Sequence, residues 1–540
     1  MFKKLAITLV ASLLLVMTVG TLSAYEALNG PTELIYYDKE KAFNGYTLFT
    51  PMTASVRYHY LIDMDGNVCH SWKVPDGYGV EKHGYLLENG HILRAIVQGR
   101  SGAPLYQEVD WDGNVVWEFQ DKRSDYMGHH DFHKIWNEKL KEHTYLIVTQ
   151  KEISHEDAIA LGCDPELRSN YRSNPDGMYE VDKDGNVIWE WNIIDHLIQD
   201  VNPDLPNYGV VAEHPGKLDA NFGGGRKGDW IHTNSLDYNE TLGHAVINNS
   251  TDSEFYVIDH MATFVAGDPT KSIELAAGPK GDFLYRFGNS AIYDAGDSPS
   301  LTNDGQQASN GHQQMFFTHD IQWIEDELPG AGHFLIFDNG ARRPGETFSA
   351  ILEINPYDGE MKNGLYVSEV TAGFETLRGR SPEERSKQVA WYYKSKSTQS
   401  FYSGHISGAQ RLPNGNTLIC SGRWGHFFEV TSDGDCVWEY INPVTSTGVV
   451  KSFGDNAMGF NDTFRCHRYA PDFSGLKGKD LTPKGKITEL FVKLIPAGRG
   501  GAGAAGGEGA AAGRGAAGGE GAAAGRGAAA GRGAAGGRGE

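Results

Sequence analysis

The sequence is poor in cysteine, in positive charge and in long hydrophobic runs. It holds five cysteines in 540 residues, and none lies in a Cys-x-x-Cys pair or at a Cys/His spacing that predicts a zinc site. The formal net charge of −22 excludes a basic surface, so we do not expect non-specific binding of nucleic acid. Neither a set of metal ligands nor a cofactor motif is visible, and we therefore expect no cofactor.

The one marked hydrophobic run lies at the start of the chain. Lys3 and Lys4 precede the apolar stretch 5–19, and the small residues Ser23 and Ala24 follow it. This order is typical of a signal peptide, residues 1–24, with cleavage after Ala24. No later run is long and apolar enough to span a bilayer, so we expect a periplasmic or secreted protein; an uncleaved anchor is the alternative.

In an oxidising compartment the cysteines could form disulfides, but their number is odd. They are Cys69, Cys163, Cys420, Cys436 and Cys466. Cys420 and Cys436 lie in the same predicted meander and are the pair that we expect to be bridged, which leaves at least one free thiol or a bond to another chain.

A repeated strand pattern dominates the rest of the chain. Residues 402–443 alternate apolar and polar positions and are broken by turns at 413–416 and 433–435, which predicts a four-stranded antiparallel meander. An Asp-Gly turn followed by a strand with a tryptophan recurs before Trp72, Trp117, Trp189 and Trp438. Repeats of four short strands predict a β-propeller, whose blades pack around a channel.

A lone strand near the end of the repeats, 461–469, has no outer strands after it. It can complete the blade whose other strands come from 46–72. We therefore predict an all-β fold: a six-bladed β-propeller closed by the pairing of N- and C-terminal strands in one blade. The expected parts are a signal peptide (1–24), an irregular lead-in (25–44), the propeller (45–476), a linker (477–496) and a disordered Gly/Ala-rich C-terminal tail (497–540).

Each predicted blade has a histidine near the start of its first strand. These are His83, His130 or His133, His232, His319, His405 and His467. Because the first strand of a propeller blade is innermost, the imidazoles converge on the channel. They could bind a metal, with 129–133 as the densest cluster, bind an anion, or supply a nucleophile with its acid and base. The alternative is that they only cap strands.

Arginines near the same strand ends favour an anion or a transferred group over a metal. They are Arg342, Arg343, Arg465 and Arg468, and a guanidinium matches a tetrahedral oxyanion such as sulfate. For Arg343 and Arg468 a surface ion pair is the alternative.

Several segments are similar to one known family. They are 229–235 (DWIHTNS), 337–340 (FDNG) with the arginines that follow, 407–419 (SGAQRLPNGNTLI), 462–476 (DTFRCHRYAPDFSGL), and 45–49 leading to 60–63. In these segments, spread over most of 45–476, the chain resembles the bacterial arylsulfate sulfotransferases, which use no nucleotide sulfate donor.

The resemblance implies a six-bladed propeller and a ping-pong reaction. His405 would take the sulfuryl group of an aryl sulfate as sulfohistidine and pass it to a phenol. His232 and His319 would support it, and Arg342 or Arg343 would bind the sulfuryl group. We further expect contacts to substrate from five residues, and no metal: Asn234, Asn339, His130, Arg465 and His467.

Two other functions remain open from the sequence. One is an exported, non-catalytic propeller that binds a sulfated or carboxylated ligand at its channel mouth. The other is a metal- or quinone-dependent enzyme. As partners we expect an aryl sulfate and a phenol, no nucleic acid, no membrane span after cleavage, and a homodimer as one possible assembly.

Overall fold

The computed structural model describes residues 30–53, 57–99, 102–165, 173–223, 228–301, 308–309, 311–357, 386–452 and 460–491. All of them belong to one compact unit, residues 1–495. The predicted signal peptide, 1–24, and the predicted tail, 497–540, lie outside the described residues.

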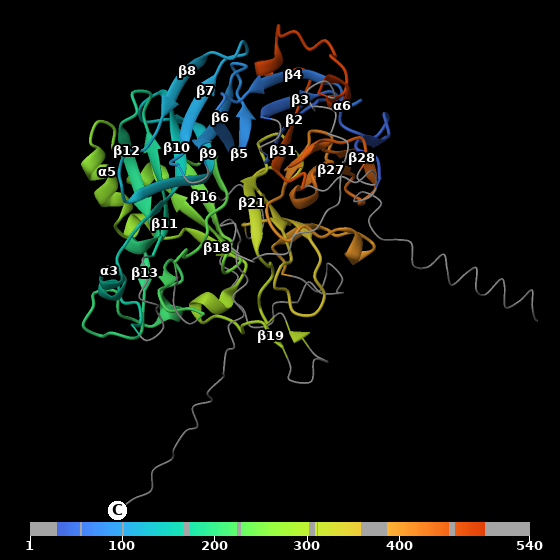
Figure 1. Ribbon diagram of the computed structural model, residues 1–540. Coiled ribbons are helices and arrows are strands. Elements are labelled where there is room, and N and C mark those ends of the chain that lie inside the picture. The colour runs from blue at the N-terminus through green and yellow to red at the C-terminus, as the bar shows by residue number, and fades with distance from the viewer. Residues whose placement is uncertain are drawn as a thin grey trace, which may run out of the picture. The chain divides into compact units, whose positions relative to one another are not determined.

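The described strands form six antiparallel sheets, one for each predicted blade (Figure 1). From inner to outer strand, the first three blades are β31 (Thr463–Tyr469), β2 (Tyr46–Pro51), β3 (Tyr58–Ile62) and β4 (Val68–Lys73); β5 (Tyr78–Leu86), β6 (Ile92–Gln98), β7 (Leu105–Val109) and β8 (Val115–Phe119); β9 (Tyr126–Asn137), β10 (Glu142–Lys151), β11 (Asp176–Val181) and β12 (Val187–Asn192).

The other three blades follow the same order. They are β15 (Leu236–Asn239), β16 (His244–Asn249), β17 (Glu254–Asp259) and β18 (Tyr285–Phe287); β21 (Thr318–Trp323), β22 (Phe334–Asp338), β23 (Ala350–Ile354) and β24 (Val389–Tyr393); β25 (Gly408–Arg411), β26 (Thr417–Ser421), β27 (His426–Val430), β28 (Cys436–Ile441) and β1 (Glu33–Tyr37). The inner strands contact one another in a closed ring, β31–β5–β9–β15–β21–β25–β31. The predicted six-bladed propeller is confirmed.

The ring closes within the first blade, as predicted. The C-terminal strand β31 pairs antiparallel with the N-terminal strand β2, with Tyr46 opposite Tyr469 and Phe49 opposite Cys466, and the two strands lie side by side in Figure 1. Pairing chain ends in one sheet removes the two free edges that an open array would expose.

Two segments outside the predicted propeller differ from expectation. The lead-in was expected to be irregular, but Glu33–Tyr37 forms β1, the fifth and outermost strand of the last blade, paired with β28. The expected linker packs on the first blade: Lys484 N–H donates to Val68 O at 2.8 Å, and Ile487 of the short helix α6 (Ile487–Leu490) is fully buried. Both segments cover strands that would otherwise be blade edges.

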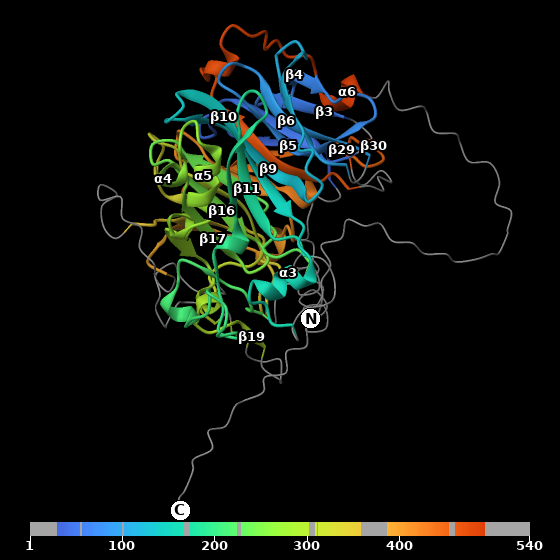
Figure 2. The ribbon, with the colours of Figure 1, turned by 90° about the vertical axis from the view of Figure 1, so that its left-hand side faces the viewer.

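The remaining described elements lie mainly in insertions. They are α3 (His155–Ala160), β13 (Leu197–Ile198), β14 (Leu218–Asp219), α4 (His260–Thr263), α5 (Pro269–Ala276), β19 (Ser300–Leu301), β20 (Ala308–Ser309), β29 (Val444–Thr445) and β30 (Gly448–Val449). In Figures 1 and 2, α3 and β19 lie together at one end of the propeller.

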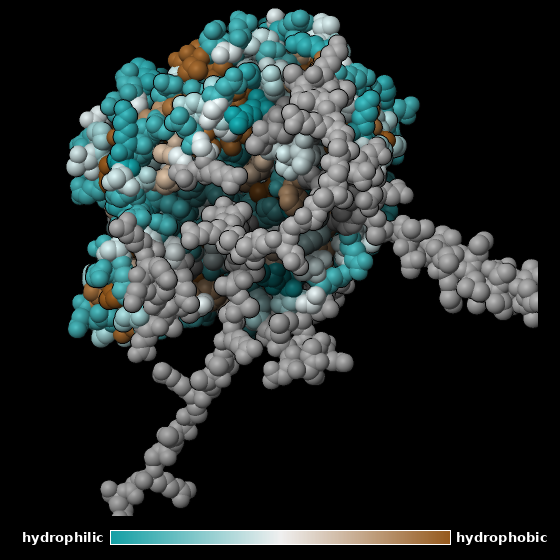
Figure 3. All heavy atoms as spheres, viewed as in Figure 1, coloured by the Kyte–Doolittle hydropathy of each residue, from teal (hydrophilic) through white to brown (hydrophobic). Residues whose placement is uncertain are grey.

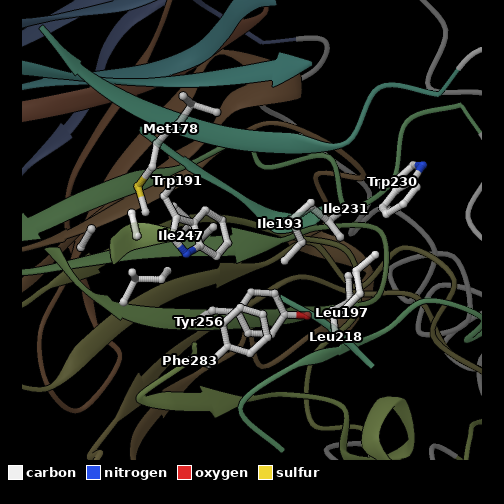
Figure 4. Close-up of a cluster of buried hydrophobic side chains, with 14 of the residues drawn as sticks. Met178, Trp191, Ile193, Leu197, Leu218, Trp230, Ile231, Ile247, Tyr256 and Phe283 are labelled. Atoms are coloured by element: carbon white, nitrogen blue, oxygen red, sulfur yellow. The ribbon is translucent and has the colours of Figure 1, made fainter. Parts of the chain in front are cut away.

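The insertion between the third and fourth blades is anchored by a buried apolar cluster (Figure 4). Leu197 and Leu218 of the insertion pack with Trp191 of β12 and Tyr256 of β17, and Trp230 ends it. Full burial of each large apolar side chain stabilises the fold by roughly 2–3 kcal/mol. This packing fixes the point at which the chain enters the segment that carries His232.

The expected Cys420–Cys436 disulfide is wrong, because all five cysteines are free. Cys420 lies on β26 and Cys436 on β28, with β27 between them. Strands two positions apart are separated by about 10 Å, beyond the roughly 7 Å that a disulfide can bridge.

The surface of the described part is mostly hydrophilic on the face shown in Figure 3. Among the described helices, none has the length and apolar character needed to cross a membrane.

Candidate active site in the propeller channel

The inner strands carry irregularities where they pass one another. The pairing register shifts between Val80 and Gly84 of β5, between Gly128 and Phe132 of β9, between His319 and Gln322 of β21, and between Thr463 and Cys466 of β31. Such bulges redirect side chains and are common next to active sites. Residues with left-handed φ gather in the same region: Lys82 (90°), His130 (53°), His232 (49°), Asp320 (57°), Arg342 (67°), Ile406 (51°) and Ser407 (97°). Strain of this kind marks functional positions.

The buried ring of Phe464, on the β31 bulge, marks the point where the blades meet. His83 stacks on it at a centroid distance of 5.3 Å, and the rings of His130 and His319 lie 5.9 and 6.3 Å away. The ammonium of Lys82 lies 5.9 Å from the same ring. We call these four residues and Phe464 the central cluster; they come from four different blades.

His319 connects the central cluster to the segment that carries His405. The Ile406 N–H donates to His319 Nε2 at 3.1 Å, so this nitrogen is unprotonated, and Nδ1–H donates to Asn339 Oδ1 at 2.7 Å. The Asn339 amide in turn donates to the carbonyls of Ser403 and Ile406, at 2.6 and 2.7 Å. Asn339 therefore holds both the neutral tautomer of His319 and the loop around His405.

The His405 loop, 403–407, is a tight and strained turn before β25. The His405 carbonyl accepts hydrogen bonds from Ser403 Oγ (3.2 Å) and Ser407 Oγ (3.4 Å), while its half-buried side chain leaves the turn. Burial raises the pKa of the nearby Asp462, and the charges of Arg423 and His405 oppose that rise. Asp462 accepts from Arg423 at 2.8 Å.

His232 belongs to an Asp–His pair. Its Nδ1 hydrogen-bonds to Asp229 Oδ2, and Asp229 Oδ1 also accepts from Gln150 Nε2 at 2.9 Å. The buried carboxylate of Asp176 accepts the backbone N–H groups of Ile231, His232 and Thr233 at 3.0–3.3 Å, which explains how His232 keeps its left-handed conformation.

His130 lies against His232, with ring centroids 4.8 Å apart in an edge-on arrangement. Burial, and next the charge of Lys82, hold the pKa of His130 well below its usual range, so its ring is neutral at neutral pH. His129 Nδ1 is 2.7 Å from His130 Nδ1, and its Nε2 is 3.3 Å from Asp176.

The two adjacent arginines have different environments. Arg343 is buried in an ion pair with Asp338 (2.6 Å), and its guanidinium lies 4.1 Å from the ring of Phe348. Arg342 is exposed, and its guanidinium lies 5.2 Å from the ring of Phe317, whose ring contacts His319 at 5.6 Å. Arg342 is thus the arginine on the side of His319.

Three of the residues predicted to contact substrate lie elsewhere. Arg465 is buried and bridges Asp131 (2.7 Å) and Asp320 (2.8 Å), and it also donates to Asn234 O at 3.0 Å. Asn234 is buried and donates to Thr318 O at 3.0 Å, which joins the fourth and fifth blades.

His467 lines a different space, as does one edge of Arg465. A cavity of about 650 Å³ lies at the carboxyl ends of the inner strands, and its wall includes His133, His467 and Asp237. We call it the second cavity. The buried Asp131–Arg465–Asp320 network forms part of the layer between the second cavity and the central cluster.

Lys82, Phe464 and Asp229 were not singled out from the sequence. For Asp229 a signal existed, because it lies three residues before His232 in a segment that was quoted. Lys82 and Phe464 sit in bulges, and no local pattern reveals those. In the described part of the chain, no group of three or more His, Cys, Asp or Glu side chains has an arrangement suited to a metal ion.

Comparison with known proteins identifies one family. Residues 38–354 match the model of the arylsulfotransferase (ASST) family. No curated protein is significantly similar to the chain.

Solved structures give only weak similarity. A protein of unknown function from Bacteroides caccae is 11% identical, with a TM-score of 0.36, over 79% of this chain and 98% of its own. Virginiamycin B lyase from Staphylococcus aureus is 10% identical, with a TM-score of 0.31, over 79% of this chain and 89% of its own. Scores this low support no conclusion about function.

Proposed function

Because this chain belongs to the arylsulfotransferase family, we propose that it moves a sulfuryl group from an aryl sulfate to a phenol through a sulfohistidine at His405, as an exported protein. The observation that carries the proposal is the convergence of His232, His319 and the His405 loop around one channel, with Arg342 beside it. These groups come from the fourth, fifth and sixth blades.

In the first half-reaction a ring nitrogen of His405 attacks sulfur. The N–S bond forms, the S–O bond to the aryl group breaks, and the leaving phenolate takes a proton from His232. Asp229 supports this role, because a carboxylate at Nδ1 stabilises the protonated imidazole before the transfer and fixes its direction.

In the second half-reaction the steps reverse with another phenol. His232, now neutral, accepts the phenol proton, the phenol oxygen attacks sulfur, and the N–S bond breaks. His405 and the protonated His232 are restored, so no co-reactant is consumed.

Two further residues have distinct tasks in this proposal. Arg342 donates N–H groups to the sulfuryl oxygens, which carry the negative charge of the transition state. His319 does not exchange protons, since both of its nitrogens are engaged; it holds the backbone of Ile406 and so positions His405.

The test is transfer from 4-nitrophenyl sulfate to phenol, measured as nitrophenolate release. Wild type should release nitrophenolate and form phenyl sulfate, and His405→Asn should abolish both. The matched control is His426→Asn, because His426 lies in the same blade but pairs with Glu439 at 2.9 Å on the outer strands. Binding of the ester without turnover in wild type would instead favour the non-catalytic binding protein.

A further inference from the structure

The bulge in β5 brings a lysine to the central cluster. Glu81, Lys82 and His83 lie between the last regular pair, at Val80, and the resumed pairing at Gly84. Because Lys82 has a φ of 90°, both it and its neighbour His83 reach the ring of Phe464, with the ammonium 5.9 Å away and the imidazole stacked on it. A regular strand would send these consecutive side chains to opposite faces.

The ammonium of Lys82 has little compensating negative charge. In the described part of the chain, the one carboxylate oxygen within 4.0 Å is that of the adjacent Glu81, at the limit of that range. The side chain is only 23% exposed, and its other charged or polar neighbours are imidazoles, first of all His130. A partly buried cation beside neutral rings favours an anionic ligand.

We propose that Lys82 is a further catalytic residue of this site, whose ammonium donates hydrogen bonds to the non-bridging oxygens of the sulfuryl group. This rests on the proposed function. Lys82 forms and breaks no covalent bond: the sulfur moves between the aryl oxygen and His405, while Lys82 and Arg342 offset the charge on the oxygens that do not move. Lysine suits this task as a compact point charge, and arginine as a planar fork.

The test compares three lysine variants by nitrophenolate release and by thermal stability. Lys82→Met removes the charge and keeps the length, and Lys82→Arg keeps the charge. The matched control is Lys134→Met, on the inner strand β9, because Lys134 is paired with Glu108 at 2.7 Å on the side of the second cavity.

We expect Lys82→Met to lower kcat/KM for 4-nitrophenyl sulfate on the order of 100-fold, with Lys82→Arg recovering most of the loss. Lys134→Met should change kcat/KM by less than about threefold.

Calorimetric binding in the His405→Asn background separates charge recognition from packing. There Lys82→Met should weaken phenyl sulfate about tenfold and leave phenol unchanged, because only the ester carries the anion. Equal loss for both ligands, or full activity of Lys82→Met, would overturn the assignment. Should wild type transfer nothing, the proposed function fails, and these titrations alone decide whether Lys82 recognises the sulfate.

Discussion

Replacing Asn339 by alanine should damage the site far more than its effect on stability explains. The buried Asn339 side chain makes three hydrogen bonds, to His319 Nδ1 and to the carbonyls of Ser403 and Ile406. At a net value of about 1 kcal/mol each, their loss lowers the free energy of unfolding by roughly 3 kcal/mol.

The kinetic effect comes from the loop that these bonds hold. Ile406 and Ser407 have φ values of 51° and 97°, and such conformations cost on the order of 1–3 kcal/mol each unless the surroundings impose them. Without Asn339 the loop relaxes and His405 moves; a shift of about 1 Å costs on the order of 100-fold in rate.

The matched control is Asn137→Ala, assayed by nitrophenolate release and chemical denaturation. Asn137 is equally buried and also makes three hydrogen bonds: it donates to Glu180 Oε1 at 2.7 Å and accepts from the N–H groups of Lys139 and Leu140, both at 3.1 Å. It lies at the far end of β9, so Asn137→Ala should lose similar stability and keep its turnover. Equal turnover of the two variants would refute the claim that Asn339 positions His405.

Three other substitutions give distinct outcomes. Burial raises the pKa of Asp237 to about 7 from its ordinary 3.8, so the folded protein holds this proton more tightly than the unfolded chain and wild type loses stability as pH rises from about 4 to 7. Asp237→Asn should therefore gain about 1–3 kcal/mol at about pH 8 and nothing near pH 4 in denaturant titrations, and an equal gain at both would contradict this. Arg343→Met should lose about 3–5 kcal/mol, because it leaves a buried carboxylate unpaired, whereas Arg342→Met should keep its stability and lose turnover on the order of 100-fold; the reverse pattern would exchange their roles. Asp229→Asn should slow transfer from phenyl sulfate more than from 4-nitrophenyl sulfate, because the poorer leaving group depends more on the proton from His232; equal slowing would exclude that role.

The fold could be predicted from sequence because its signal is repeated. Asp-Gly turns followed by tryptophan strands mark the outer part of several blades, and the unpartnered strand at 463–469 could only complete the first one. The β1 strand was missed because a single short run before the repeats, ELIYY, gains its partner β28 from the distant end of the chain.

The site was predictable in part. Spacing placed His232, His319 and His405 on three inner strands, and they do gather around one channel. It could not separate Arg342 from Arg343, since a left-handed φ at Arg342 decides which of the two turns into the Asp338 ion pair. It also placed Arg465 and His467 with the substrate, because the bulge at Phe464, which sends them toward the second cavity, depends on pairing with β2.

The most direct measurement is the mass of the peptide that contains His405, after the protein is mixed with 4-nitrophenyl sulfate without an acceptor and quenched in alkali. The account predicts one sulfuryl group on His405, formed together with a burst of one nitrophenolate for each protein and removed when phenol is added before the quench. A sulfuryl group on another residue, or steady release of nitrophenolate with an unmodified His405, would contradict it.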